Sequence, residues 1–266
     1  PRQGLLPGRG GPTYYTPYWY HNLHFLSAAY SMTGQYRDAI AAITEAAREL
    51  EPVARMEPMF EASLSMPLFT EVRFQQWDKI LAMPQPASFS ITVNNVWHFA
   101  RGMALAGKGK IKEAKLSQDA FDKAIASISE ERNFGLNPEK AIMRIASHSL
   151  AAKLALAEGN LDLATSHLTR AVQEEDQLNY DEPAGWYYPP TREALAVVQL
   201  KAGKAGLAER TFRDELANNR RSGRAIFGLM EALKAQGKAD AAQLNEALYK
   251  RAWAKADQPL TLNQLF

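Results

Sequence analysis

The sequence predicts an all-α protein built from about six antiparallel helical hairpins, one of them degenerate. Helical periodicity runs almost unbroken from near Tyr18 to about Lys255. No segment alternates polar and apolar residues as a half-buried strand would. One local pattern also recurs along the chain, and internal repetition of this kind is typical of stacked helical units.

The recurring pattern is centred on a glycine at each predicted turn between paired helices. These glycines are Gly34, Gly109, Gly159, Gly203 and Gly237. The residue five positions later is always alanine: Ala39, Ala114, Ala164, Ala208 and Ala242. Seven positions earlier stand Ser27, Gly102, Ala152, Ala196 and, as the exception, Met230. Glycine can take the left-handed conformation that ends a helix, and small residues on both sides let two helices approach closely.

This pattern resembles the tetratricopeptide repeat family, whose units are 34 residues long. Gly203 and Gly237 are separated by 34 residues, and the clearest stretches run from Gly34 to Ile40 and from Gly159 to Ala164. The resemblance covers about residues 18 to 256. It implies a right-handed superhelix of antiparallel helical hairpins, an α-solenoid. An ordinary helical bundle with alanine-rich contacts is the alternative.

A narrower resemblance connects the chain to a group of uncharacterised bacterial tetratricopeptide proteins. It depends on three stretches: Tyr20 to Leu26, Trp97 to Gly102 and Asp181 to Glu193. Members of that group often carry further histidine-containing repeats upstream. The group implies no established reaction, so this resemblance highlights residues without naming a substrate.

The domain organisation follows from the repeats. We expect an extended or disordered lead-in over residues 1–13, rich in glycine and proline, one repeat domain over 14–256 and a tail over 257–266. The final helix, about Ala239 to Ala256, would cap the stack. Because the chain opens on Pro1 with no initiator methionine, we expect a processed or trimmed product.

The degenerate unit spans about Met59 to Met83. Gln75 replaces the turn glycine and Ile80 replaces the alanine, with Trp77 between them. Pro67 should kink the first helix of this unit, and the second helix should be cut short by Pro84 and Pro86. Two longer loops are expected over 130–138 and 177–190, and loops of this size in compact repeats are often functional.

Composition excludes several classes of function. Charged residues make up 23% of the chain, the net charge is +2, and lysine and arginine are scattered; a nucleic-acid surface would need a basic stripe. The chain has no cysteine, which excludes disulfides and thiolate metal sites and fits either cytoplasm or periplasm. No apolar run approaches the roughly 18 residues of a membrane span.

The histidines are unevenly distributed over the repeats. The resemblance implies that the first helix of each hairpin lines a concave groove; these helices are 18–32, 60–73, 94–106, 145–157, 190–201 and 223–235. Four of the five histidines lie there: His21, His24, His98 and His148. His98 and His148 each stand eleven residues before a turn glycine, where a core histidine is the simpler interpretation.

His21 and His24 share a face of a helix, because they are three residues apart. Family members that clamp a peptide carboxylate have lysine, arginine or asparagine there, so that role is not transferred. The pair could pack, contact a ligand or form half of a divalent transition-metal site. A metal would need a third ligand, for which Glu182, Asp181 and Glu193 are candidates by type. No His-Glu-x-x-His helix and no phosphate-binding glycine loop is present.

Aromatic and arginine side chains complete the predicted groove. Tyr18 precedes the histidine pair, Trp97 adjoins His98, and Trp186 and Tyr188 lie in the long loop. Aromatic anchors suit peptide recognition, although each could equally pack between helices. Arg101 and Arg192 could reach an anionic group, and Arg192 could instead cap or cross-link the loop.

Three functional hypotheses follow. The first is a non-enzymatic scaffold whose groove binds a peptide or partner protein. The second is a metal-binding or metal-dependent hydrolytic site centred on His21 and His24. The third is self-association through an exposed end of the solenoid, since stacked repeats need capped ends.

Overall fold

A computed structural model of the chain describes residues 12–86, 89–181, 183, 186, 188 and 190–266. Helices account for 74% of the structure and there is almost no sheet, which confirms the all-α class. Glu182, expected at the site, and most of the lead-in lie outside the described residues.

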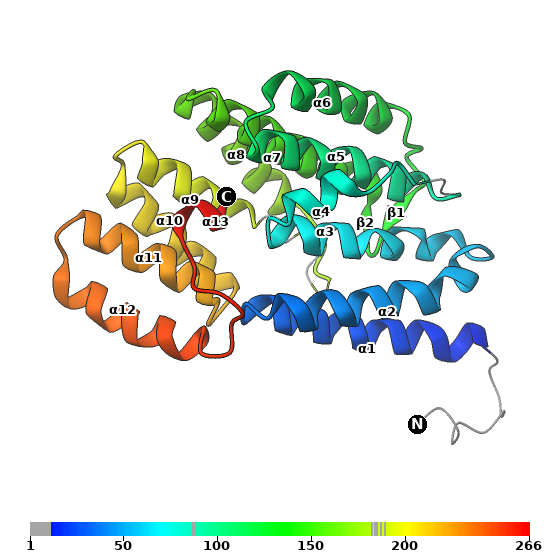
Figure 1. Cartoon of the computed structure of the whole chain (residues 1–266), viewed down its shortest axis with the longest axis horizontal. Coiled ribbons are helices and arrows are strands. Elements are labelled where there is room, and N and C mark those ends of the chain that lie inside the picture. The colour runs from blue at the N-terminus through cyan, green and yellow to red at the C-terminus, as the bar shows by residue number, and fades with distance from the viewer. Residues whose placement is uncertain (1–11, 87–88, 182, 184–185, 187, 189) are drawn as a thin grey trace.

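Neighbouring helices pack as antiparallel pairs (Figure 1). The regular pairs are α1 (Pro12–Met32) with α2 (Tyr36–Ala54), α5 (Ile91–Gly107) with α6 (Ile111–Ala126), α7 (Glu139–Ala157) with α8 (Leu161–Glu175), α9 (Thr191–Lys201) with α10 (Ala205–Asn218), and α11 (Gly223–Ala235) with α12 (Ala239–Ala252). A less regular unit contains the 3-10 helix η1 (Pro58–Ser65), α3 (Met66–Arg73) and α4 (Trp77–Ala82). A short α13 (Leu262–Leu265) ends the chain.

The turns between paired helices have one geometry. The five predicted turn glycines all have φ between +72° and +79°, and Gln75 takes φ +53° in the degenerate unit. After each turn a backbone N–H donates to the carbonyl five residues back, as Lys110 N does to Leu105 O (2.9 Å) and Gln76 N to Glu71 O (2.9 Å). This is the bond of a Schellman C-cap. The predicted role of the glycines, and of Gln75 in their place, is confirmed.

The small residues flanking the turns are in the core. The alanines five positions after the glycines are buried, as are Ser27, Ala152 and Ala196. A Cβ on Gly102 would meet a methyl carbon of Leu150 at 2.6 Å, so α5 and α7 approach closely there. Helices α5, α7, α9 and α11 bury residues around much of their circumference, whereas α6, α8, α10 and α12 bury only a narrow stripe. These four first helices therefore form the inner layer, while α1 buries a single stripe of Tyr20, His24, Ser27 and Ser31.

Two helix boundaries and the form of one kink differ from the sequence-based expectation. Helix α1 begins at Pro12, six residues before the predicted start, and α12 ends at Ala252 instead of Ala256. The expected kink at Pro67 takes the form of a 3-10 segment, η1, that leads into α3. Pro84 and Pro86 follow α4 directly, as predicted.

The loop over 130–138 contains a small β-hairpin that the sequence did not predict. Strand β1 (Asn133–Phe134) pairs antiparallel with β2 (Asn137–Pro138). Gly135 follows β1 with φ +61°. Two-residue strands are too short to show the alternation on which strand prediction depends.

The expected C-terminal tail is packed against the body of the protein. Leu265 and Phe266 are buried, and Arg224 donates to the carbonyls of Gln264 and Leu265 (3.1 Å each). At the start of the segment, Asp257 N donates to Gly34 O (3.0 Å). The last helical pair therefore meets the turn between α1 and α2, and the ends of the array lie together (Figure 1).

One hydrophobic cluster runs through the inner layer of all the helical units. Within the described ranges, none of the helices is both long and apolar enough to cross a membrane.

Candidate functional site

A pocket of about 490 Å³ opens between α1 and the β-hairpin. We call it the α1–hairpin pocket. Its described lining residues come from α1 (Pro17, Tyr18, Tyr20, His21, His24), from η1 and α3 (Met59, Phe60, Ala62, Ser63, Met66), from the hairpin (Asn133, Phe134, Gly135, Leu136) and from the long loop (Asp181, Pro183). Its volume falls within the range of about 300–1,000 Å³ typical of small-ligand pockets.

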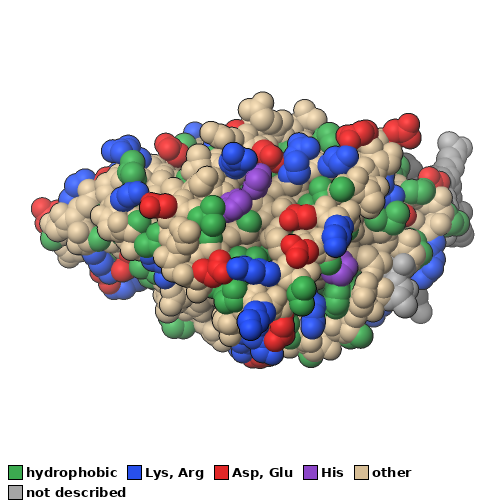
Figure 2. All heavy atoms as spheres, turned by 90° about the horizontal axis from the view of Figure 1, so that it is seen from above, with side chains coloured by type: hydrophobic (Ala, Val, Ile, Leu, Met, Phe, Trp, Pro, Cys, Tyr) green, Lys and Arg blue, Asp and Glu red, His purple; other side chains and the backbone are tan. Residues whose placement is uncertain are grey.

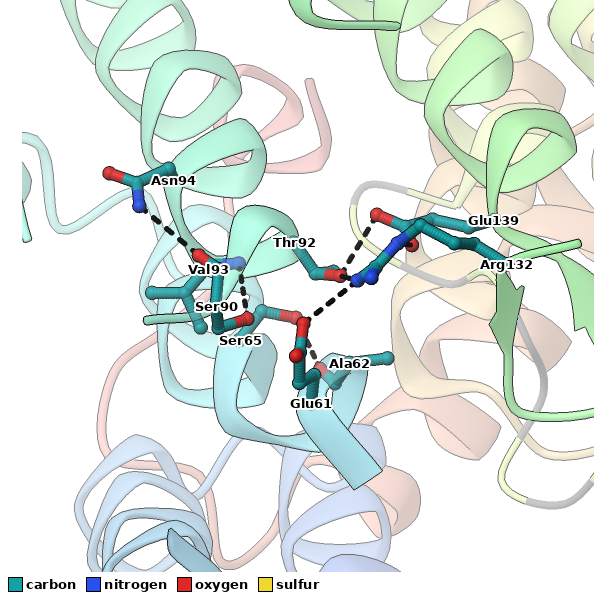
Figure 3. A network of polar contacts seen from close by, with 9 residues as sticks. All are labelled: Glu61, Ala62, Ser65, Ser90, Thr92, Val93, Asn94, Arg132 and Glu139. Atoms are coloured by element: carbon teal, nitrogen blue, oxygen red, sulfur yellow. Dashed lines mark hydrogen bonds and ion pairs between the residues drawn. The ribbon is translucent and has the colours of Figure 1, made fainter. Parts of the chain in front are cut away.

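Arg132 anchors the hairpin to the helical body (Figure 3). Its Nε donates to Glu139 Oε2 (2.8 Å), and its Nη2 donates to Glu61 Oε2 (2.8 Å) and Thr92 Oγ1 (3.0 Å). Thr92 Oγ1 in turn donates to Glu139 Oε1 (2.9 Å). One guanidinium thus ties the hairpin to η1, α5 and α7, which fixes one wall of the pocket.

The long loop docks on the outer edge of the same hairpin. Asn179 N donates to Asn137 Oδ1 (2.7 Å), and Asn179 Nδ2 donates to Leu136 O (3.0 Å). Leu136 N donates to Asp181 Oδ2 (3.1 Å). A Cβ on Gly135 would lie 2.4 Å from that carboxylate oxygen, so the close approach requires glycine. These bonds hold Asp181 at the pocket.

The rim of the pocket is apolar and open to solvent. Tyr18 is 60% exposed, Met59 70% and Leu136 65%. Phe134, Ala62 and Met66 lie buried behind them. Asp181 is the one carboxylate among the described lining residues, and no lysine or arginine is among them. The pocket therefore favours an apolar group and disfavours an anion.

His24 contributes a buried polar group to the pocket wall. Its imidazole packs beside Tyr20, with ring centroids 5.4 Å apart, and its Nε2 has no hydrogen-bond partner among the described residues. Burial, reinforced by the charge of His21, lowers the pKa of His24 to about 4. The ring is therefore neutral at pH 7, and its buried unsatisfied nitrogen carries a free-energy cost.

His21 also borders the pocket but has different surroundings. It is exposed, and its ring packs against Phe25 with centroids 4.7 Å apart. The two histidines therefore border the same pocket, His21 at the surface and His24 buried. Among the residues that the structure describes, no group of three His, Asp or Glu side chains could hold a metal ion.

Trp186 and Tyr188 are buried, each only 2% exposed. Of the two interpretations that the sequence left open, contact with a ligand or packing between helices, the structure shows packing for both. Trp186 packs edge-on against Phe69 (5.4 Å between centroids) and Tyr188 stacks on the same ring (5.4 Å). The long loop fills this space with its own aromatic side chains, because burying them against Phe69 and Phe99 removes a large apolar area from water.

Trp97, His98 and Arg101 form a separate group on α5. Trp97 is buried and donates to Met83 O (3.4 Å), and the Arg101 guanidinium lies 5.4 Å from its ring. Burial, with the charge of Arg101, lowers the pKa of His98. None of the three lines the α1–hairpin pocket.

The remaining predicted residues are engaged in helix-to-helix contacts. Arg192 forms an ion pair with Asp176, as the alternative cross-linking prediction for this residue expected. Glu193 forms a buried ion pair with Arg224 (2.7 Å). His148 contacts His167 of α8. Of the predicted site residues, the pocket thus brings together Tyr18, His21, His24 and the metal-ligand candidate Asp181.

Sequence reasoning missed the pocket residues of η1 and of the hairpin. Met59 and Leu136 belong to no recognisable sequence motif, and only their exposed position next to α1 in the structure identifies them as pocket residues. The contact of His167 with His148 could have been predicted from the sequence. In an antiparallel pair of helices, residues at similar distances from the turn face each other, and these two histidines stand on either side of Gly159.

No family model matches the chain, and no curated protein matches it either.

Proposed function

We propose that this protein is a helical-repeat scaffold that binds a short apolar peptide segment of a partner protein in the α1–hairpin pocket. The observation that carries the proposal is the pocket itself: apolar walls, an exposed rim and one buried imidazole nitrogen without a described partner. Binding sites commonly combine apolar walls with a few polar groups that fix orientation.

The proposed architecture is a right-handed superhelix of the tetratricopeptide type. Support comes from the repeated turn, in which positive φ and the same N–H to carbonyl bond recur from Gly34 to Gly237. The buried alanines and the inner layer of first helices agree with it. The pocket residues of α1 and η1 belong to such first helices, on which the family places its ligand contacts.

The peptide's chemistry follows from the pocket lining. Tyr18, Met59 and Leu136 offer adaptable apolar contact at the rim. The neutral His24 ring adds an uncharged wall. Asp181 would repel an acidic residue. We therefore expect a segment with one large apolar side chain and no carboxylate beside it.

A random-peptide display library selected on the wild-type protein tests this proposal. We expect enrichment of peptides with a large apolar residue. Their affinity should fall about tenfold or more in a Tyr18→Ala/Met59→Ala variant, since rim anchors at a small interface each contribute about 1 kcal/mol or more. Fluorescence polarisation with the labelled peptide measures the change.

A matched variant, Leu116→Ala/Leu244→Ala, removes two comparably exposed side chains from α6 and α12 and should bind the peptide like wild type. Equal affinity for both double variants, or enriched peptides without an apolar residue, would contradict the proposal.

The metal-dependent alternative at His21 and His24 is less well supported. Both rings border the pocket, but His24 is buried against Tyr20, and the described residues supply no third ligand.

A further inference from the structure

The C-terminal segment, residues 257–266, lies on the inner layer of helices in the way that a bound peptide would. Figure 1 shows it running from the end of α12 to α13, which contacts α9 and α11. Most of the segment is at the surface, and only its last two residues, Leu265 and Phe266, are buried. The four residues of α13 are too few to form a stable helix alone, so contacts with the body of the protein determine its position.

Side chains of the body bind the main chain of this segment. Gln75 Nε2 donates to Asn263 O (2.8 Å), and Arg224 Nη2 donates to the carbonyls of the next two residues (3.1 Å each). Lys201 Nζ donates to the side chain of Asn263 (2.8 Å). The donors come from the α3–α4 turn, from α11 and from α9. Recognition of a peptide commonly combines main-chain hydrogen bonds of this kind with pockets for a few side chains.

Phe266 covers a buried lysine of α7. Lys153 Nζ lies 5.0 Å from the centroid of the Phe266 ring and 5.8 Å from that of Trp77. Figure 2 shows acidic and basic side chains interspersed on one face of the molecule, whereas Lys153 belongs to none of the ion pairs between described residues. Burial, reinforced by the charge of Lys201, lowers the pKa of Lys153 to about 8. The docked segment therefore helps to bury a cation that has no counter-ion, a cost that is relieved when the segment leaves.

A cavity of about 350 Å³ lies between the middle of the segment and the body of the protein. Its lining combines Asp257 to Leu260 and Gln264 with Tyr36, Phe74 and other residues of the first helical units. Because this part of the segment borders a cavity, it can move away from the body without opening the hydrophobic core.

We propose that residues 257–266 occupy a second peptide-binding site, and that a partner segment with a leucine followed by an aromatic residue takes their place. The segment seated in the site defines the chemistry of this partner. Its leucine enters the core, its aromatic ring covers Lys153, and its main chain accepts the hydrogen bonds of Gln75 and Arg224.

The site is separate from the α1–hairpin pocket, since none of the side chains that hold the segment lines that pocket. While it is docked, the protein's own segment competes with the partner and so inhibits binding at this second site. The inference goes beyond the function proposed above and does not depend on it.

Fluorescence polarisation with a labelled synthetic peptide of residues 257–266 tests the proposal. A full-length Leu265→Ser/Phe266→Ser variant, whose own segment no longer docks, should bind the peptide saturably. Wild type should bind it with an affinity about tenfold lower or less, because its own segment competes at an effective concentration in the millimolar range. A peptide with serine in place of the leucine and the phenylalanine should bind neither protein.

Two pairs of substitutions, each added to Leu265→Ser/Phe266→Ser, locate the bound peptide. Gln75→Ala/Lys201→Ala removes two donors to the segment and should weaken binding about threefold or more. Lys123→Ala/Gln243→Ala is the matched control, since it removes an exposed lysine and an exposed glutamine from α6 and α12, and it should leave the affinity unchanged.

Circular dichroism and the melting temperature check that each variant is folded. Equal affinity of wild type and the folded Leu265→Ser/Phe266→Ser variant, or no binding to that variant, would overturn the proposal. If the serine substitutions unfold the chain, wild type decides: saturable binding at millimolar peptide that the serine peptide lacks supports the proposal, and its absence overturns it. A wild-type dimer in light scattering that these substitutions convert to a monomer would assign the site to a second copy of the chain and would also overturn it.

Discussion

His24 illustrates how one residue links burial, charge and the proposed binding. Its ring extends from α1 and is buried in the pocket wall, and its Nε2 has no hydrogen-bond partner among the described residues. The fold tolerates this cost because the ring stays neutral. A neutral imidazole buries far more cheaply than a charged one, which is the physical reason for its lowered pKa.

The stability of the protein should therefore depend on pH through His24. An unfolded histidine has a pKa of 6.5, while that of folded His24 is about 4, so the unfolded chain binds more protons between these values. The contribution is fully present above pH 6.5 and is lost as the pH falls toward 4. We expect a loss on the order of 3 kcal/mol at pH 4.

Urea denaturation at several pH values measures this loss. His24→Leu should show a flatter dependence than wild type between pH 7 and pH 4, because the other histidines titrate in both proteins. Parallel curves for the two proteins would mean that His24 is not the group responsible.

At the scale of elements, the β-hairpin depends on Arg132 more than on its own strands. Two-residue strands contribute little pairing energy. The guanidinium instead serves two carboxylates, of which Glu139 has no exposed side-chain surface. Removing the cation would leave this carboxylate buried and uncompensated.

Arg132→Met should lower the free energy of unfolding by about 3–5 kcal/mol, the usual cost of breaking a buried pair from one side. Lys250→Met is the control, because its pair with Glu246 is exposed and should contribute little to stability. Chemical denaturation of both variants measures the difference. Similar small losses in both would show that the Arg132 network does not stabilise the fold.

At the scale of the whole molecule, the first and last helical pairs are in contact. Trp253 packs where Gly34 has no side chain: a Cβ on Gly34 would lie 2.4 Å from the indole ring. Asp257 Oδ2 accepts from Arg37 N (2.9 Å) across 220 residues of chain. These contacts partly cover the ends through which an open stack would self-associate.

Two glycine substitutions distinguish the stability contributed by the turn conformation from that contributed by the contact between the first and last helical pairs. Gly109 and Gly34 share a left-handed backbone, but a Cβ on Gly109 meets nothing within 4 Å. Gly109→Ala should cost about 1–2 kcal/mol from backbone strain alone. Gly34→Ala should cost about 1–3 kcal/mol more, because the new methyl collides with Trp253.

Thermal and urea unfolding of the two variants measure the costs, and in a Trp253→Ala background the Gly34→Ala substitution should cost no more than Gly109→Ala. Equal losses for the two glycine variants would mean that the closing contact carries no stability.

The sequence by itself determined the helical hairpins, their turns and the identity of the residues that cap them. These features depend on local properties: the 3.6-residue period, the left-handed conformation of Gly34 and its counterparts, and the small side chains on either side. Even the degenerate unit was predictable, because Gln75, Trp77 and Ile80 keep its register.

Only the tertiary structure decided which side chains meet. The α1–hairpin pocket combines residues near positions 20, 60, 135 and 181, and the ends of the array meet across nearly the whole chain. It also buried Trp186 and Tyr188, for which the sequence left both a ligand contact and packing between helices open. Such contacts arise from the packing of whole elements against one another, and no local periodicity encodes that arrangement.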